Sequence, residues 1–286
     1  MSDAHLDGED RAVAEAIAAL PPLRVALADA GMQAKKSLGQ HFLFDLNITS
    51  RIAGLAGDLT QGTTIEIGPG PGGLTRALLA AGARNLVAVE RDERATALLA
   101  PVAKAAQGRF DLIAGDAMQV DCATLGPAPR RIVANLPYNV ATPLLVGWLK
   151  QADAFDRLVL MFQKEVAERI TAAPGDDAFG RLAVLANWRC RTAIAMHLPA
   201  RAFTPPPKVD SAVVILIPRD PAPTDCTLEA LEKVTAAAFG QRRKMLRRSL
   251  ASLGGEALLE KLGIDPTQRA EELEIADFAR IASAIS

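Results

Sequence analysis

The sequence predicts an α/β protein with a parallel sheet, followed by a small helical domain. Five short apolar runs alternate with helical patterns between residues 64 and 162, and such alternation is typical of βαβ units. The runs are residues 64–67, 86–89, 110–114, 132–134 and 158–162. Beyond a proline-rich stretch near residue 220, the spacing of apolar residues is helical to the end of the chain, which predicts the second domain.

These elements divide the chain into four parts. Residues 1–34 form an N-terminal extension that is acidic near its start, and residues 35–218 form the α/β domain. Residues 219–225 form a proline-rich linker, and residues 226–286 form the helical domain. Two late apolar runs, 193–198 and 212–217, flank a loop with three consecutive prolines, so we expect them to pair antiparallel at one edge of the sheet.

Composition agrees with a cytoplasmic protein. The chain has 286 residues, of which 50% are hydrophobic and 23% charged, enough for one large core and a small second one. The uncharged run 132–149 nears membrane-spanning length, but its asparagines and prolines indicate a strand, a loop and a buried helix. The acidic N-terminus does not resemble a signal peptide. We expect neither a disulfide framework nor a metal site from the scattered Cys122, Cys190 and Cys226.

A glycine-rich loop follows the first predicted strand. Gly68, Gly70 and Gly73 have the G-x-G-x-x-G spacing that lets a backbone approach a nucleotide-like ligand at the end of a parallel strand. Pro69 and Pro71 remove two N–H donors from this loop, which disfavours the pyrophosphate of a dinucleotide. The loop therefore favours an adenosine cofactor without phosphates.

Three acidic residues accompany the ends of the predicted strands. Glu90 lies close to the offset of about 20 residues at which a carboxylate binds the ribose hydroxyls of an adenosine cofactor. Glu66 and Asp116 lie where negative charge would attract the cation of S-adenosylmethionine. The alternative for each acid alone is a strand end that reaches solvent, but three such acids together favour a cofactor site.

The segment Asn135-Leu136-Pro137-Tyr138 follows the fourth strand and predicts a site for a flat ring that bears an amino group. Pro137 favours an extended Leu136, so the neighbouring backbone carbonyls can accept hydrogen bonds, and the Asn135 side chain adds another acceptor. A base stacked on Tyr138 would gain roughly 1–3 kcal/mol. The alternative is an ordinary turn after a buried strand.

In combination these segments resemble the ribosomal RNA adenine N6-dimethyltransferases, most closely the bacterial small-subunit enzymes of the kasugamycin-linked type. The matching segments are residues 37–43, 66–70, 115–117, 135–139, 203–211 and 239–244, and the resemblance extends from about residue 35 to the C-terminus. It implies a Rossmann-like methyltransferase domain that uses S-adenosylmethionine, with a small all-helical C-terminal domain. The residues expected at the cofactor are His41, Leu43, Glu66, Gly68, Gly70, Glu90, Asp116 and Asn135.

The resemblance also implies a reaction. Methyl groups would go to N6 of two adjacent adenosines in the 3′-terminal hairpin loop of 16S rRNA, within an immature small subunit, and the enzyme would act as a monomer. Residues 135–138 would form the catalytic segment, and Phe203 would cover the target adenine on the face opposite Tyr138. Phe203 has the alternative of a core residue. His41 has the alternative of a packed residue, since it stands next to apolar Phe42 and Leu43, and its position is often asparagine in the family.

Basic residues near the C-terminus predict an RNA contact, although the net charge of the chain is only −1. Five cations within seven positions fall in one predicted helix with no acidic residue nearby, and their repulsion favours a polyanionic partner over a solvated face. Four more cations, two before the cofactor segment and two near the sheet edge, extend the track. The nine residues are Lys35, Lys36, Arg189, Arg191, Arg242, Arg243, Lys244, Arg247 and Arg248.

Two other functions are less favoured. Methylation of DNA adenine or of a protein amide uses related Asn/Asp-Pro-Pro-Tyr sites, but here Leu136 replaces the first proline. A nucleic-acid-binding or ribosome-assembly factor with a vestigial cofactor site belongs to another class of protein. Glu90, Asp116 and Asn135 are all present, which argues against a loss of the cofactor site.

Overall fold

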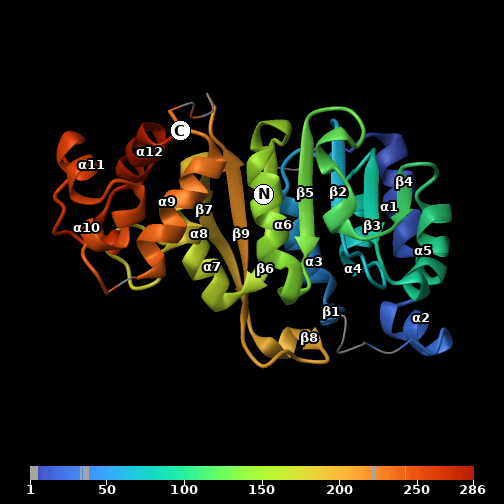
Figure 1. The fold of residues 1–286 in the computed structure, drawn as a ribbon. Coiled ribbons are helices and arrows are strands. Elements are labelled where there is room, and N and C mark those ends of the chain that lie inside the picture. The colour runs from blue at the N-terminus through green and yellow to red at the C-terminus, as the bar shows by residue number, and fades with distance from the viewer. Residues whose placement is uncertain (1–5, 33, 35–38, 221–222, 224, 242) are drawn as a thin grey trace. The chain divides into compact units, whose positions relative to one another are not determined.

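The computed structural model describes residues 6–32, 34, 39–220, 223, 225–241 and 243–286. Within these residues seven strands form one sheet in the order β4-β3-β2-β5-β6-β9-β7 (Figure 1). Neighbouring strands from β4 to β6 pair in parallel, as the predicted βαβ units require. The strands are β2 (Thr63–Ile67), β3 (Leu86–Glu90), β4 (Phe110–Ala114), β5 (Arg130–Asn135), β6 (Arg157–Gln163), β7 (Cys190–Leu198) and β9 (Ser211–Pro218).

The chain forms two compact units. The first comprises Met1–Lys164 and Ala195–Ile215, and the second comprises Glu165–Ile194 and Leu216–Ser286. In the first unit every residue of β2 and β3 is buried, because helices cover both faces of a parallel sheet. Its helices are α1 (Gly8–Ala18), α2 (Leu23–Asp29), α3 (Leu46–Leu55), α4 (Gly73–Ala80), α5 (Glu93–Ala105) and α6 (Tyr138–Lys150).

Two short strands that the sequence did not predict lie in the first unit. β1 (Phe42–Leu43) pairs antiparallel with β8 (Phe203–Thr204), with Leu43 opposite Phe203. Two residues are too few to show the alternation by which a strand is recognised in a sequence. The pairing joins the segment before the glycine loop to the proline-rich loop, which is about 160 residues further along the chain.

The second unit is mainly helical. The half-buried Phe239 packs against Phe179 and Phe278, with ring centroids 5.9 and 5.5 Å away, and the latter two are fully buried. The unit includes two helices from the segment that the sequence assigned to the α/β domain, because α8 packs on α9 and α12. Its helices are α7 (Lys164–Thr171), α8 (Arg181–Arg189), α9 (Leu228–Gly240), α10 (Leu246–Ser249), α11 (Gly255–Lys261) and α12 (Ile275–Ala284).

The prediction of one basic helix is wrong. α9 ends at Gly240, Arg243 and Lys244 lie in a turn, and Arg247 and Arg248 belong to the four-residue helix α10. The physical reason is tertiary. The backbone N–H of Leu246 donates to the Gln268 carbonyl at 2.8 Å and that of Arg247 to the Pro266 carbonyl at 3.1 Å, so the segment bonds a distant loop instead of its own preceding turn.

Candidate active site

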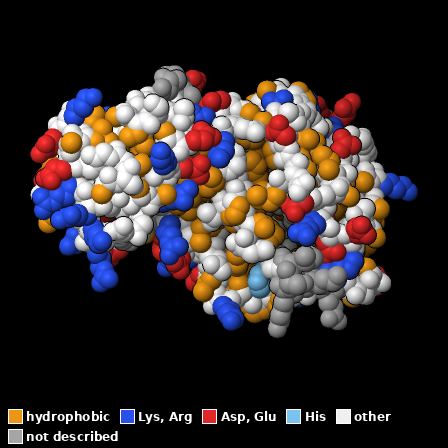
Figure 2. All heavy atoms as spheres, viewed as in Figure 1, with side chains coloured by type: hydrophobic (Ala, Val, Ile, Leu, Met, Phe, Trp, Pro, Cys, Tyr) orange, Lys and Arg blue, Asp and Glu red, His pale blue; other side chains and the backbone are white. Residues whose placement is uncertain are grey.

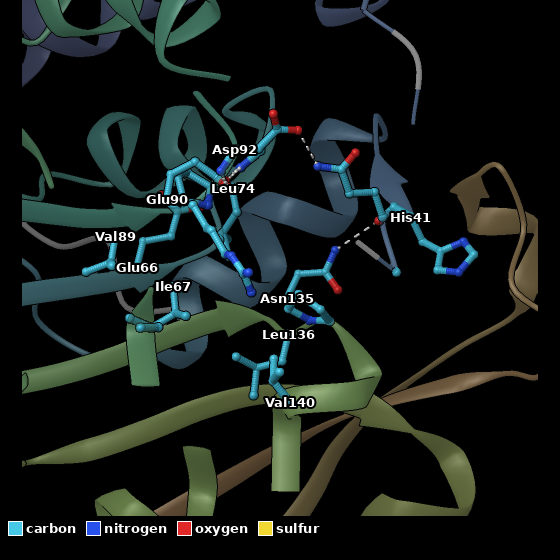
Figure 3. Close-up of a pocket in the computed structure, with 18 of the residues that line it drawn as sticks. His41, Glu66, Ile67, Leu74, Val89, Glu90, Asp92, Asn135, Leu136 and Val140 are labelled. Atoms are coloured by element: carbon cyan, nitrogen blue, oxygen red, sulfur yellow. Dashed lines mark hydrogen bonds between the residues drawn. The ribbon is translucent and has the colours of Figure 1, made fainter. Parts of the chain in front are cut away.

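A pocket opens at the carboxyl ends of β2, β3 and β5, where ligands bind in sheets of this kind (Figure 3). It holds about 1240 Å³, counting the part open to solvent, which suits a nucleoside-sized ligand. Eleven predicted site residues line it, namely His41, Leu43, Glu66, Gly68, Gly70, Glu90, Asp116, Asn135, Leu136, Pro137 and Tyr138. Phe203 does not line this pocket.

The glycine loop forms one wall of the pocket. Gly70 has a φ of 52°, a left-handed conformation that favours glycine, and a Cβ there would lie 3.3 Å from the Phe42 ring. At Gly73 the reason for glycine is space, because a Cβ there would lie 2.7 Å from the Leu43 carbonyl oxygen. The loop therefore contacts the β1 segment closely at two points.

Glu90 ends β3 with its carboxylate held by two backbone amides. Its Oε2 accepts from the N–H of Gly70 at 3.0 Å, and its Oε1 accepts from the N–H of Asp92 at 2.7 Å. Burial raises the pKa of Glu90, and the two amides partly offset this effect. Because each carboxylate oxygen can accept a further hydrogen bond, Glu90 can serve both the loop and a ligand.

Glu66 is the most deeply buried acid of the pocket, with 1% of its surface exposed. Its Oε2 has no hydrogen-bond partner among the described residues. Burial raises the pKa of Glu66 to about 8, and the nearby charge of Glu90 contributes in the same direction. A buried carboxyl oxygen without a partner is costly unless a ligand supplies a donor or a positive charge, so this wall fits a cationic cofactor.

Asp116 lies at the outer part of the pocket. Its Oδ1 accepts from the Met118 N–H at 3.0 Å, which starts a short 3₁₀ turn. Its Oδ2 lies 3.5 Å from the guanidinium of Arg91, and 39% of the side chain is exposed. One carboxylate oxygen of Asp116 is therefore hydrogen-bonded to the backbone, while the side chain remains accessible from the pocket.

The Asn135 amide is oriented by the segment before β1. Its Nδ2 donates to the His41 carbonyl at 3.2 Å (Figure 3), so the amide oxygen Oδ1 is left as the acceptor. The His41 ring points away from Asn135, and its Nδ1 lies 2.7 Å from the Pro205 carbonyl oxygen. His41 thus contacts Asn135 through its backbone and the proline loop through its side chain.

Tyr138 begins α6 and is held on two sides. Its ring stacks near the His41 ring, with centroids 5.8 Å apart and an angle of 26° between the planes. Its hydroxyl lies 2.7 Å from the Ser211 Oγ, and burial raises the pKa of the phenol. Sequence reasoning did not identify Ser211 as a site residue. Its place in the matched segment 203–211 was the available signal.

Phe203 occupies a different place from the one expected. Its side chain is 2% exposed and packs in the main core with Leu43, Ile52 and Met161. In this structure the core alternative therefore describes Phe203. The physical reason is that the β1–β8 pairing turns its apolar ring inward, where burial is favourable.

The predicted RNA contacts fall into distinct groups. Lys35, Lys36 and Arg242 lie outside the described residues. Arg189 is only 8% exposed, with its guanidinium 5.6 Å from the Trp188 ring, which leaves little of it for a phosphate. Basic side chains gather near α10 and α11 on the face shown in Figure 2. The exposed candidates are Arg191, Arg243, Lys244 and Arg248, and the half-buried Arg247 lies 3.4 Å from Glu256.

The described residues contain neither a candidate membrane-spanning helix nor a candidate metal-binding group. None of their helices combines the length and the apolar character needed to cross a membrane. In the same part of the chain, no three histidine, cysteine or acidic side chains are grouped so that they would hold a metal ion.

Comparisons with known proteins agree with this geometry. The model of the family described as "Ribosomal RNA adenine dimethylase" matches residues 31–286. A "Ribosomal RNA small subunit methyltransferase A" from Paramagnetospirillum magneticum is 61% identical over 270 residues, which cover 94% of this chain and 96% of that protein. The protein of the same name from Rhodospirillum rubrum is 57% identical over 267 residues, covering 93% of each chain.

Solved structures show the same fold. A dimethyladenosine transferase from Plasmodium falciparum has a TM-score of 0.74 and 26% identity, covering 84% of this chain and 96% of that one. The 23S rRNA methyltransferase ErmE has a TM-score of 0.64 and 26% identity, covering 85% of this chain and 99% of that one. The predicted Rossmann-like methyltransferase fold is thereby confirmed.

Proposed function

This chain belongs to the ribosomal RNA adenine dimethylase family, and on that premise we propose how its pocket acts on RNA. It is an S-adenosylmethionine-dependent enzyme that dimethylates adenine N6 in the RNA of the small ribosomal subunit. The proposed targets are two adjacent adenosines in the 3′-terminal hairpin loop of 16S rRNA. We further propose that the enzyme meets this RNA in an immature subunit and acts as a monomer.

The hydrogen bond between Asn135 and the His41 carbonyl is the observation that most supports this proposal. The amino group of adenine carries two hydrogens, so the protein must present acceptors to it. With Nδ2 engaged at His41, Oδ1 of Asn135 is the acceptor that remains, and the Leu136 carbonyl is the proposed second one. Hydrogen bonds from both N6 hydrogens favour a pyramidal nitrogen whose lone pair is free to attack.

The cofactor would be held by the acids at the strand ends. S-adenosylmethionine supplies a methyl group already activated on a positively charged sulfur. Glu90 is proposed to accept from the ribose hydroxyls, because its two backbone amides fix the direction of the carboxylate. The accessible carboxylate of Asp116 is proposed to balance the positive charge of the ligand, and the unpartnered Oε2 of Glu66 is proposed to accept a hydrogen bond from it.

The contribution of the protein is mainly positioning. Correct alignment of two reactants can supply ~7–11 kcal/mol of barrier lowering. An adenine in structured RNA must first leave its stack, which costs a few kcal/mol, and stacking on Tyr138 would offset part of that cost. The Tyr138 ring is held by Ser211 and lies beside the His41 ring. Little further side-chain entropy is therefore lost when a base stacks on it.

Mass mapping of methylated adenosines tests the proposal. Undermethylated small-subunit particles are incubated with the enzyme and isotopically labelled S-adenosylmethionine, and the RNA is digested and sequenced by mass. We expect label as N6,N6-dimethyladenosine at two adjacent positions near the 3′ end, and orders of magnitude less with Asn135→Ala. Label only on large-subunit RNA, on DNA or on protein would contradict the proposed target.

A further inference from the structure

Helix α2 packs behind the pocket although residues 23–29 lie outside the part of the chain that matches the family model. Leu27 is 7% exposed and belongs to one buried apolar cluster with Phe42 and with Leu98 of α5. Leu23 is 5% exposed, and its Cδ1 would lie 3.3 Å from a Cβ at Gly73. The two leucines, four residues apart on one face of the helix, therefore reach two separate parts of the site.

Both of the contacted residues are walls of the cofactor pocket. Phe42 and Gly73 line it directly. The Phe42 ring also lies against Gly70, where a Cβ would be 3.3 Å from Phe42 Cε1. A continuous row of packed groups thus runs from Leu27 through Phe42 to the glycine loop, and Gly70 in turn donates to the carboxylate of Glu90.

Other contacts fix α2 to the first unit. The buried Arg76 on α4 donates to the Pro21 carbonyl at 2.7 Å, immediately before the helix. The guanidinium of Arg24 lies 4.8 Å from the centre of the Phe44 ring. These contacts tie the α2 segment to α4 and to Phe44, which directly follows β1.

The preceding helix α1 is fixed as well. Asp10 is fully buried and accepts hydrogen bonds from Arg84 and Arg109, and Arg84 also pairs with Asp7. The Arg84 bond and the Arg109 bond lower the pKa of Asp10. Val13 and Ile17 on the same helix join the main core. Helix α1 is thus anchored in the core of the first unit.

We propose that α2 is a positioning element of the cofactor site. Leu27 packs behind Phe42 and Leu23 packs behind Gly73, and together they hold the glycine loop in its binding conformation. The inference rests on the proposed cofactor site. Glycine-rich loops lose much conformational freedom when a ligand orders them, and packing that orders the loop in advance reduces this loss. The leucines touch no ligand, so their effect is on cofactor affinity and not on the chemical step.

Leu27→Ala in the full-length protein tests this role. We expect the dissociation constant for S-adenosylmethionine, measured by calorimetry, to rise roughly fivefold or more, the lower end of typical coupling between sites. The kcat at saturating cofactor should stay unchanged, and so should affinity for the small-subunit particle. The matched control is Leu59→Ala, which truncates a leucine of the main core that is 3% exposed and does not line the pocket.

Two further variants keep the test decisive if Leu27→Ala folds poorly. Leu27→Met retains the volume and should restore affinity, whereas Leu23→Ala removes the side chain that lies beside Gly73 and should weaken binding. Wild-type affinity in folded Leu27→Ala and Leu23→Ala would overturn the inference, as would an equal loss in Leu59→Ala. A wild-type enzyme that binds no S-adenosylmethionine would instead overturn the proposed function itself.

Discussion

The hydroxyl of Tyr138 lies 2.7 Å from the hydroxyl of Ser211, a fully buried residue at the start of β9. The two residues are 73 positions apart in the chain. This bond ties the catalytic segment after β5 to the strand that follows the proline-rich loop. The orientation of the Tyr138 ring therefore depends on a part of the fold that carries no cofactor contact of its own.

Ser211→Ala should lower kcat/KM for RNA by up to about tenfold, because a typical hydrogen bond contributes ~0.5–1.5 kcal/mol. Tyr138→Phe removes the other partner and keeps the ring, so it should have a similar effect. Since both substitutions break one bond, the double variant should be no worse than either single one. A double-mutant cycle on kcat/KM measures this coupling, and strictly additive losses would contradict it.

Glu90→Ala should weaken S-adenosylmethionine binding by at least ~1.5–3 kcal/mol, the contribution of a hydrogen bond to a charged group. The loss also frees the Gly70 N–H, which Glu90 holds at 3.0 Å. Glu93→Ala, an exposed neighbour at the start of α5, is the matched control and should bind normally. Calorimetry measures the dissociation constant for S-adenosylmethionine in the three proteins. Unchanged affinity in a folded Glu90→Ala would remove Glu90 from the site, and tight NAD binding by the wild type would refute a methyltransferase.

Asn135→Ala should reduce methyl transfer by orders of magnitude while affinity for the small-subunit particle changes little. The reason is that Oδ1 is the acceptor aimed at the reacting amine, whereas the exposed cations lie elsewhere. Asn135→Asp separates the two functions of the amide, because it keeps an acceptor but cannot donate to the His41 carbonyl as Nδ2 does at 3.2 Å. Single-turnover assays and particle binding measure the two effects. Loss of particle binding would show a structural role instead.

Replacing Arg243 and Arg248 by glutamine should flatten the plot of log RNA affinity against log salt by roughly 1–2 units, since each neutralised phosphate contributes about 0.7–0.9. Both side chains are exposed, whereas Arg247 already lies 3.4 Å from Glu256. S-adenosylmethionine affinity should stay the same. Arg51→Gln on α3 is the control for a simple change of net charge. An unchanged slope would show that Arg243 and Arg248 face solvent and do not contact RNA. A lower melting temperature of the variant would show that the two side chains stabilise the fold instead.

The buried carboxyl of Glu66 should make stability fall as pH rises. Its pKa in the folded state is about 8, against 4.5 when exposed, so between these values the unfolded state releases a proton that the folded state keeps. This effect should be of the order of 3 kcal/mol at pH 7. Glu66→Gln should remove it, with a higher melting temperature at pH 7.5 and little change at pH 4.5. Equal pH profiles for the two proteins would show that Glu66 is ionised when folded.

The sequence by itself determined the sheet and the principal pocket. Alternating apolar runs and helical patterns depend on local periodicity, so the strands from β2 to β6 appear close to the predicted positions. Glu90, Asn135 and the glycine loop follow strand ends, and parallel strands bring their carboxyl ends to one edge. That rule is geometric, which is why eleven predicted residues line one pocket.

Tertiary structure alone decided what depends on contacts between distant segments. The β1–β8 pairing buries Phe203, the Gln268 and Pro266 carbonyls interrupt the expected basic helix, and α2 reaches the pocket from behind. In each case the partner lies far away in the chain, so no local pattern records it. The hydrogen bond between Tyr138 and Ser211 has the same origin. The low dielectric that strengthens this bond exists only after the chain has folded around the two hydroxyls.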